Sequence, residues 1–363
     1  IYYEWVDVKN SGVEGKPITF KAFPGDKPII DGRGVDVPNW YGLFRSRGNN
    51  YITIDGFEVR NTDQLLISMT RGNHLTIRNC IAHSNSGPNG SDNHRSGIFI
   101  SRCSDVLVEN CEVYDTGWNA FTAESSNYIT FQNCYAHDNP NHIGFNVFPV
   151  TTENPQAQYY GLKIKNCIAA RTACGIFTRY QVNAEISNNL IYGSRGGGIY
   201  FTDNRDGGNG YLSYNYNSNS KILNNTIANI GLVSPSTSGV AVYNASGMTI
   251  KNNIIANVGN HAIYIAAPAI SGTTINDNLY DTSARFYWGS KSYDSLSSWQ
   301  SVSKDSNSLE SDPHFKNISA GDYTLTDSSS NTIGKGVNMT TVGILSADKS
   351  VLDPPDNLRV AQN

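Results

Sequence analysis

The chain lacks several features by which common protein classes are recognised. Only 16% of its 363 residues are charged, and its formal net charge is −4, so its charge gives no basis for nucleic-acid binding. No apolar run is long enough to span a bilayer. The sequence also contains no CxxC pair and no paired His-Cys spacing, which argues against a zinc site. We therefore expect no nucleic-acid partner and no membrane span.

A helical stripe is also missing until the tail, whereas one short phrase recurs nine times. Each copy is an aliphatic strand followed by Asn-Cys, Asn-Asn or a close variant. The copies are ITIDGF, LTIRNC, VLVENC, ITFQNC, LKIKNC, AEISNN, SKILNN, MTIKNN and TTINDN, and consecutive copies lie 22 to 36 residues apart. A basal period of 22 to 23 residues with variable additions is typical of a solenoid, whose coils bury a shared core only by stacking.

The kind of solenoid follows from the spacing of apolar residues within each repeat. They alternate with polar residues in runs of three to six, which indicates short strands rather than helices. Leucine-rich repeats would need a regular Leu frame and a helical back, whereas these units are rich in Ile, Val, Asn, Gly and Thr. The sequence predicts an all-β, right-handed parallel β-helix solenoid with three short strands per coil and about nine to ten coils.

The turn asparagines of successive coils should lie above one another. Asn suits this place because it tolerates the backbone angles of the turn and its amide can hydrogen-bond to adjacent coils. The residues concerned are Asn79, Asn110, Asn133, Asn166, Asn188, Asn224 and Asn252.

These repeats resemble those of the pectate-lyase-like, right-handed parallel β-helix repeat proteins over roughly residues 18 to 280. The resemblance implies the fold. It does not imply one reaction, because the same scaffold carries lyases, hydrolases, epimerases, phage tailspikes and adhesins. Composition fits a secreted or cell-surface solenoid, and we expect a monomer.

Three regions are expected along the chain. Residues 1–280 should form the β-helix, residues 281–350 a C-terminal cap packed on the last coils, and residues 351–363 a linker to a further module. The cap would cover strand edges that otherwise invite association with another chain. Because the first residues begin inside what resembles a coil, we expect the natural precursor to be longer.

Four of the six cysteines occupy the same inward coil position. They are Cys80, Cys111, Cys134 and Cys167, and Asn189 and Asn225 continue the series in later coils. An inward ladder of small side chains explains these residues without covalent chemistry. We therefore expect free buried thiols rather than disulfides.

The variable additions to the coil all flank one series of strands. These strands are GIFIS at 97–101, AFTAES at 120–125, IGFNVF at 143–148, CGIFTR at 174–179, GIYFTD at 198–203 and GVAVYN at 239–244. Loops on both borders of one sheet would make a trough suited to an extended polymer. Alternation predicts that its floor consists of Phe99, Ser101, Phe121, Ala123, Gly144, Asn146, Phe148, Phe177, Arg179, Tyr200, Thr202 and Tyr243.

Four arginines fall on two successive coils, on or beside this trough: Arg171, Arg179, Arg195 and Arg205. A guanidinium binds a carboxylate through two parallel hydrogen bonds, so the group predicts an anionic polysaccharide partner rich in uronic acids. Further candidate substrate contacts are Asn146, Phe177, Tyr200, Trp118 and His94. Aromatic rings can stack on sugars, although stacking on one another between coils explains any single ring equally well.

The preferred chemistry is β-elimination at a uronate. The resemblance implies an Arg or Lys base, with the substrate carboxylate neutralised by Ca²⁺ or by a positive side chain. By position Arg179 is the candidate base, and Tyr180 or His142 could protonate the leaving oxygen. Asp203, Asp206 and Glu124 could hold calcium, which takes several oxygen ligands. The aspartate cluster with a nearby Lys that marks the calcium-dependent lyases does not occur on these strands.

Two other functions remain open. Glycoside hydrolysis needs two carboxyl groups across the scissile bond, which Glu124, Asp203 and Asp206 could supply with Asp115 or Asp138. However, Asp115 and Asp138 recur at one coil position, as turn-forming residues do, and no paired-aspartate or Gly-His-Gly motif of the polygalacturonase type occurs. Alternatively, the chain is a non-catalytic module that binds a glycan or acts in surface adhesion.

Overall fold

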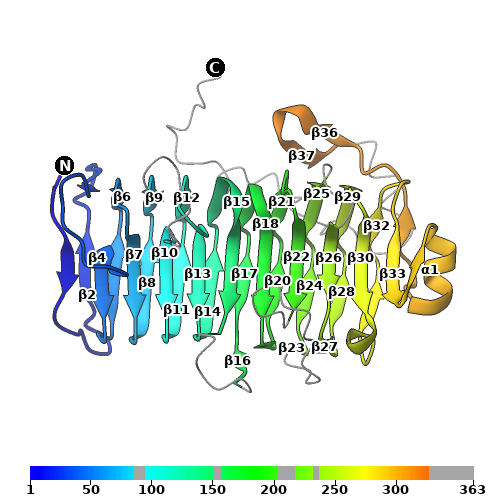
Figure 1. Ribbon diagram of the computed structural model, residues 1–363, viewed down its shortest axis with the longest axis horizontal. Coiled ribbons are helices and arrows are strands. Elements are labelled where there is room, and N and C mark those ends of the chain that lie inside the picture. The colour runs from blue at the N-terminus through cyan, green and yellow to red at the C-terminus, as the bar shows by residue number, and fades with distance from the viewer. Residues whose placement is uncertain (86–94, 150–156, 203–216, 232–236, 327–363) are drawn as a thin grey trace.

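The computed structural model describes residues 1–85, 95–149, 157–202, 217–231 and 237–326. Short parallel strands stack along one axis and give an elongated solenoid (Figure 1). Each coil contributes three strands, so the predicted parallel β-helix is confirmed. Among the described residues, no helix is long and apolar enough to cross a membrane.

One coil shows how the chain travels. The strand β11 (Ser104–Glu109) ends at Asn110, β12 (Glu112–Tyr114) follows, and β13 (Phe121–Glu124) comes after a corner. The chain then enters β14 (Asn127–Gln132), which lies beside β11 in parallel register. The three strands of a coil therefore belong to three faces of the solenoid, which we number in this order.

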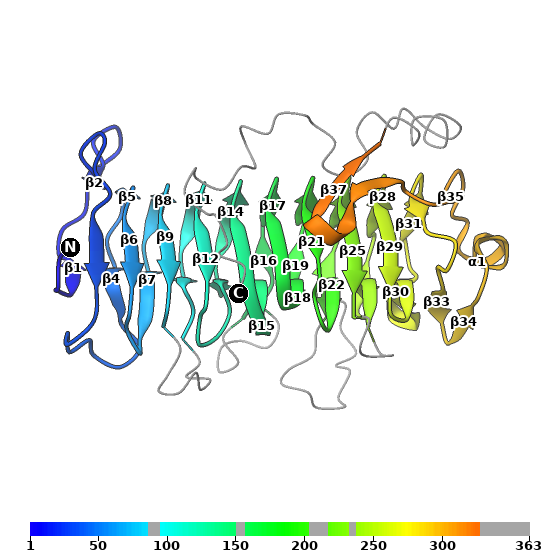
Figure 2. The same ribbon diagram turned by 90° about the horizontal axis from the view of Figure 1, so that it is seen from above.

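Face 1 is a ten-stranded parallel sheet. Besides β11 and β14 it contains β2 (Ile18–Lys21), β5 (Ile52–Asp55), β8 (Asn73–Arg78), β17 (Lys163–Lys165), β20 (Glu185–Ser187), β24 (Lys221–Leu223), β28 (Thr249–Lys251) and β31 (Thr274–Asn276). Face 1 and face 3 lie on opposite sides of the molecule when it is seen from above (Figure 2).

Faces 2 and 3 join into one sheet because β15 (Tyr135–Phe148) and β18 (Ile168–Arg179) run through both. The other strands of face 2 are β3 (Ile29–Asp31), β6 (Glu58–Arg60), β9 (Ile81–His83), β12, β21 (Leu190–Tyr192), β25 (Thr226–Ile230), β29 (Ile254–Val258), β32 (Leu279–Tyr280) and β35 (Leu309–Glu310). The other strands of face 3 are β1 (Val6–Val8), β4 (Gly42–Arg47), β7 (Leu65–Thr70), β10 (Ile98–Ser101), β13, β22 (Gly197–Thr202), β26 (Ser238–Val242), β30 (His261–Ala266) and β33 (Phe286–Gly289).

A small four-stranded sheet lies at the corner between face 3 and face 1. It consists of β16 (Tyr159–Tyr160), β19 (Gln181–Val182), β23 (Asn217–Ser218) and β27 (Ala245–Ser246). Its strands pair in parallel, as the main strands do, so this corner repeats from coil to coil.

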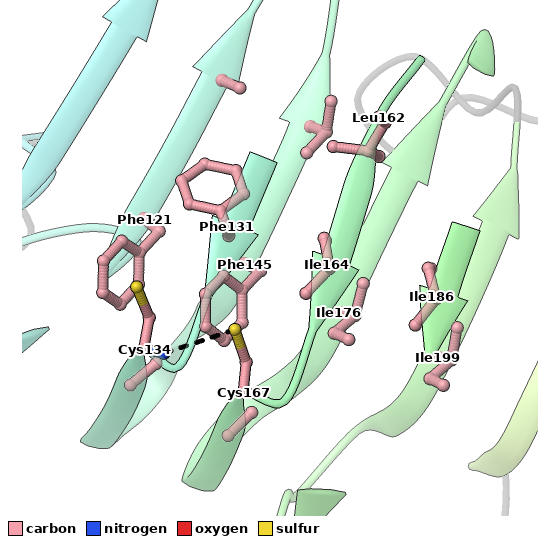
Figure 3. Close-up of a cluster of buried hydrophobic side chains, with 14 of the residues drawn as sticks. Phe121, Phe131, Cys134, Phe145, Leu162, Ile164, Cys167, Ile176, Ile186 and Ile199 are labelled. Carbon is pink, nitrogen blue, oxygen red and sulfur yellow. Dashed lines mark hydrogen bonds between the residues drawn. The ribbon is translucent and has the colours of Figure 1, made fainter. Parts of the chain in front are cut away.

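The core is a stack of inward side chains, one layer per coil. The rings of Phe121 and Phe145 stack at 4.7 Å between centroids, and Phe131 from face 1 packs edge-on against both (Figure 3). Phe121 and Ala123 are fully buried and pair with inward Ile98 and Ile100. Their predicted outward orientation was therefore wrong by one residue, because a single-residue register error exchanges the two faces of a strand.

Gly144 was also wrongly predicted to face outward. A Cβ at this position would lie 2.7 Å from the carbonyl oxygen of Gly175 and 3.2 Å from the Cβ of Ala169. It would therefore point into the crowded bend where β15 passes from face 2 to face 3. A residue without a side chain is needed there because the two strand segments approach closely.

The cysteine and asparagine column is confirmed. All six cysteines are free and buried, and the backbone N–H of Cys134 donates to Cys167 Sγ at 3.4 Å (Figure 3). In later coils the Asn189 amide donates to Asn225 Oδ1 at 2.9 Å, and Asn225 donates to Asn253 in the same way. Each of these asparagines also donates to a carbonyl of the preceding coil.

The outer turn asparagines adopt the predicted conformation. The φ angles of Asn79, Asn110, Asn133, Asn166, Asn188, Asn224 and Asn252 lie between 52° and 57°. In the first coils their amides also bond to one another, from Asn133 to Asn110 and from Asn110 to Asn79. Asp115 and Asp138, predicted as turn residues, have φ angles of 48° and 50°.

Parallel pairing continues beyond residue 280, because β30 pairs with β33 and β32 pairs with β35. The helix α1 (Leu296–Ser303) covers the end of the last coils, where fully buried Trp299 stacks on Phe286 at 4.9 Å. β34 (Lys291–Tyr293) is antiparallel to β33.

The hairpin of β36 (Phe315–Asn317) and β37 (Asp322–Leu325) folds back over face 2 (Figure 1). There the Tyr323 hydroxyl accepts a hydrogen bond from the Asn229 side-chain amide at 2.7 Å. The expected linker lies outside the described residues.

The buried asparagine column yields a stability prediction. Asn225→Leu should destabilise the fold by about 2–4 kcal/mol, because it removes hydrogen-bond partners from buried Asn189 and from the Ile186 carbonyl. Asn225→Cys should cost less, because a thiol fills this position in earlier coils. Urea unfolding of both variants measures the difference. Equal midpoints for the two variants would contradict the role assigned to the amide.

Candidate functional site

The outward residues of face 3 form two rows along the solenoid axis. Row 1 passes through Ser68, Phe99, Thr122, Asn146, Phe177, Tyr200, Ala241, Tyr264 and Tyr287. Row 2 passes through Thr70, Ser101, Glu124, Phe148, Arg179 and Thr202, with Tyr243 following. Parallel pairing spaces consecutive members by about 4.8 Å.

A carboxylate and a guanidinium stand on either side of one aromatic ring in row 2. Glu124 pairs with Phe148, and its Oε2 accepts from the Ser101 hydroxyl at 2.8 Å. The guanidinium carbon of Arg179 lies 5.8 Å from the centre of the Phe148 ring and 5.0 Å from that of Phe177. Two strand spacings place Glu124 and Arg179 about 10 Å apart along the axis.

Aromatic rings continue along the face toward the C-terminal coils. The ring centres of Tyr200 and Tyr243 are 6.1 Å apart, those of Tyr243 and Tyr264 are 5.0 Å apart, and those of Tyr264 and Tyr287 are 4.2 Å apart. All four side chains are half-buried. We call these four rings, three from row 1 and Tyr243 from row 2, the aromatic strip. Its rings contact one another, as the alternative interpretation of single aromatics anticipated, and each side chain remains partly exposed.

Tyr200 is anchored within this strip. Its hydroxyl donates to the Gly196 carbonyl at 2.9 Å and accepts from the Ser238 backbone at 3.2 Å. Burial raises its pKa well above the ordinary tyrosine value. The Tyr200 ring is therefore held in place as a surface for contact rather than as an acid.

Several outward residues of face 3 are buried. Thr122 is fully buried and Asn146 is only 4% exposed. Trp118 meets Phe148 of row 2 edge-on, with 5.7 Å between ring centres. The Oδ1 atom of Asn146 is buried without a hydrogen-bond partner. The Asn146 side chain is therefore buried, whereas Trp118, Phe148 and Phe177 are half-exposed and can contact a glycan.

Arg171 is held in a bidentate ion pair at the corner between faces 2 and 3. Its Nε and Nη2 atoms contact the two carboxylate oxygens of Asp138, at 2.5 and 2.8 Å. This hydrogen bonding raises the pKa of Arg171 and lowers that of Asp138 to about 2. The guanidinium of Arg171 already has a carboxylate partner, and its predicted substrate role stays a prediction.

Arg195 and Tyr180 also lie away from the two rows. Arg195 is exposed and donates to Asn141 Oδ1 at 3.1 Å. Tyr180 follows Arg179 at the corner, is 1% exposed and packs with Tyr159. This position does not support the predicted proton donation by Tyr180. His142 lies half-buried within β15 at the border of face 3, so it remains a candidate proton donor.

Four predicted site residues, Asp203, Asp206, Arg205 and His94, lie outside the described residues. Glu124 is thus the described member of the predicted calcium set. Within the described ranges, no group of three or more His, Cys, Asp or Glu side chains is placed to hold a metal ion. The calcium site stays a prediction.

Sequence reasoning missed the C-terminal half of the aromatic strip. Tyr264 lies in the segment HAIYIA and Tyr287 in FYWG, and both segments continue the strand series of face 3. The signal was present, because HAIYIA repeats the alternation of GVAVYN, the last strand that the trough interpretation included.

Comparisons with known proteins agree with this architecture. A family model described as "Right handed beta helix region" matches residues 41–209 and 156–336. The uncharacterized protein YwoF of Bacillus subtilis (strain 168) is 24% identical over 394 residues, which cover 89% of this chain and 81% of that protein.

Two solved structures are similar in fold. The A-module of the Azotobacter vinelandii mannuronan C-5 epimerase AlgE6 has a TM-score of 0.55 at 16% identity, over 74% of this chain and 72% of that one. Pectate lyase Pel9A has a TM-score of 0.54 at 17% identity, over 94% and 76% of the two chains. At such low identity these likenesses show the fold alone.

The Arg171–Asp138 pair yields a prediction that separates structure from substrate binding. Arg171→Gln should lower stability at pH 7 by less than about 1 kcal/mol, because both side chains are nearly half exposed and solvent screens the pair. The depressed pKa of Asp138 means that the pair stabilises above about pH 4. The stability gap between parent and variant should therefore close as the pH falls toward 2.

Thermal unfolding between pH 7 and pH 2 measures this gap. Glycan affinity should not change in the variant. A loss of affinity without a loss of stability would return Arg171 to the substrate site.

Proposed function

The chain belongs to the right-handed β-helix family, and on that premise we propose that it is a carbohydrate-active protein that acts on an acidic polysaccharide at face 3. The observation that carries this proposal is the placement of Glu124 and Arg179 on either side of Phe148 in row 2. The half-exposed side chains of rows 1 and 2, from Glu124 to Tyr287, follow the solenoid axis, which suits an extended polymer. A compact ligand would instead need an enclosed pocket.

Arg179 is suited to receive the carboxylate of a uronate. Its guanidinium lies against two aromatic rings, which favours the cation, and its planar donors match a carboxylate. An arginine side chain keeps its proton in proteins. We therefore assign Arg179 the neutralising role, rather than the role of base that its position in the sequence suggested.

Glu124 is the group that we assign to proton removal. Neutralising the uronate carboxylate makes the proton on the adjacent carbon, C5, more acidic, and a positioned carboxylate can accept that proton. A sugar ring that lies over Phe148 would have Glu124 on one side and Arg179 on the other. His142, at the border of the face, is the candidate that returns a proton to the leaving oxygen in an elimination.

Two outcomes can follow from the same first step. Loss of the oxygen on C4 cleaves the chain by β-elimination, whereas return of a proton to the opposite side of C5 inverts that centre. One similar structure is named a pectate lyase and another a mannuronan C-5 epimerase, which supports a reaction that begins at this carbon. We propose elimination as the outcome.

Hydrolysis has less support from the described residues. It needs a second carboxylate across the bond, but Asp115 and Asp138 are corner residues with positive φ angles, and Asp138 is paired with Arg171.

A function as a binding module without catalysis is supported by one feature, the aromatic strip. We also propose a secreted or cell-surface location, because the polymer would be met outside the cell. The proposed oligomeric state is a monomer. No step of the proposed reaction passes through calcium.

The experiment uses the purified chain with polygalacturonate, alginate, ulvan and glycosaminoglycans, with and without a calcium chelator. Ultraviolet absorbance reports new unsaturated uronates, and proton NMR in D₂O reports exchange at C5. Arg179→Ala and Glu124→Gln should each lower the rate by about 100-fold or more. Arg171→Gln, an arginine outside the two rows, is the matched control and should stay within about twofold of the parent.

The possible results separate the functions. Exchange at C5 without new absorbance would indicate epimerisation, and new reducing ends without absorbance would indicate hydrolysis. Glycan retention without any product would favour a binding module. A rate that responds to the chelator would support the predicted calcium site. Full activity in both Arg179→Ala and Glu124→Gln would refute the assigned roles.

A further inference from the structure

A groove of about 600 Å³ lies on the outer surface of face 1, away from the two rows of face 3. Its lining runs from Gly15 and Pro17, just before β2, to Lys165 in β17, so it crosses six consecutive coils. Six parallel strands span about 24 Å. The strands β8, β11, β14 and β17 that carry it lie side by side in Figure 1.

One wall of the groove is a column of corner residues in the left-handed conformation. Tyr51, His74, Asp105 and Tyr128 have φ angles between 53° and 56°. The rings of Tyr51 and His74 stack at 4.6 Å. Tyr128 is 56% exposed. Its ring lies against Gly161, where a Cβ would come within 2.5 Å of Cδ1.

The same corner in the following coils carries Gly161, Asn183 and Asn219. Glycine and asparagine are the residues that adopt the left-handed conformation most easily. Tyrosine at this position costs conformational free energy, and such costs concentrate at functional sites. At this corner, aromatic residues therefore occur only in coils that line the groove, in a conformation that the backbone disfavours for them.

The floor of the groove carries three threonine hydroxyl groups and one leucine. The outward residues of face 1 at this level are Thr53, Thr76, Leu107 and Thr130, which pair with one another in consecutive coils. All four line the groove: Thr53 and Thr76 lie in adjacent coils, and Leu107 separates Thr76 from Thr130. Gln132 and Lys165, which pair with each other, close the far side.

The chemistry of this lining selects the class of ligand. Its charged groups are Asp105, which lies 3.7 Å from His74, and Lys165. This balance does not suit a nucleic acid, whose phosphates need several cations. An apolar peptide would leave the threonine hydroxyl groups unpaired. Aromatic rings beside repeated hydroxyl groups suit the alternating apolar faces and hydroxyl edges of sugar rings.

We propose that this groove is a second polysaccharide-binding site, which holds a glycan chain along the solenoid axis without acting on it. The site shares no residue with rows 1 and 2, so it does not depend on the reaction assigned to face 3. Its consequence would be to keep a polymer attached to the protein while another segment reaches face 3.

The test is electrophoresis in native gels that contain polygalacturonate, sodium alginate or neutral galactomannan. The parent chain should be retarded in at least one of them. Tyr128→Asn should weaken that binding about fivefold to tenfold. Asn is the residue that the fold itself uses at the equivalent corners 183 and 219, so this variant should be at least as thermally stable as the parent. His74→Asn should also weaken binding.

Phe23→Asn is the matched control, because Phe23 is a 75% exposed aromatic residue that does not line the groove. It should migrate as the parent does. Arg179→Ala tests face 3 in the same gels and should keep most of the retardation. The proposal is overturned if no polymer retards the parent, if Tyr128→Asn behaves like Phe23→Asn, or if only Arg179→Ala abolishes retardation. Product formation is measured separately, so the reaction at face 3 and glycan binding at face 1 can each fail without the other.

Discussion

Parallel pairing between coils is the constraint on which the rest of the structure depends. Each strand bonds to the same strand of the next coil, and the buried Cys and Asn column adds one side-chain contact per coil at a fixed position. A buried amide that lost its partner would be costly. The column therefore helps to hold one register over the length of the solenoid. Every inward side chain then meets its equivalents in the neighbouring coils, as the rings of Phe121 and Phe145 do.

The same register organises the surface. Side chains that point outward are repeated at the strand spacing, so any chemical group present in several coils becomes a row. Row 2 of face 3 brings Glu124 and Arg179 to either side of Phe148, and face 1 aligns three threonines beside two tyrosines. Both surfaces match a polymer whose units also repeat. Face 1 and face 3 lie on opposite sides of the solenoid (Figure 2), so one domain can present two elongated surfaces.

Much of this architecture could be predicted from the chain because the signals are local. The repeated phrase specified the coil, the turn asparagines and the buried thiols, all of which the structure confirms. The site was less predictable. Arg179 was correctly placed on the outward side, but Phe121 and Ala123 were assigned to the wrong side of their strand. Arg171 was included in the site although it pairs with Asp138, 33 residues earlier in the chain.

The sequence by itself determined the period, the class of strand and the residue types that fill the core, because alternation and turn chemistry act within one coil. Only the tertiary structure decided which polar side chains remain available to a ligand. That depends on how the coils pack, as the burial of Asn146 and the ion pair of Arg171 with Asp138 show. The groove on face 1 is likewise a tertiary feature, because Tyr51 and Tyr128 come from coils that are not adjacent and share a wall only when the corners stack.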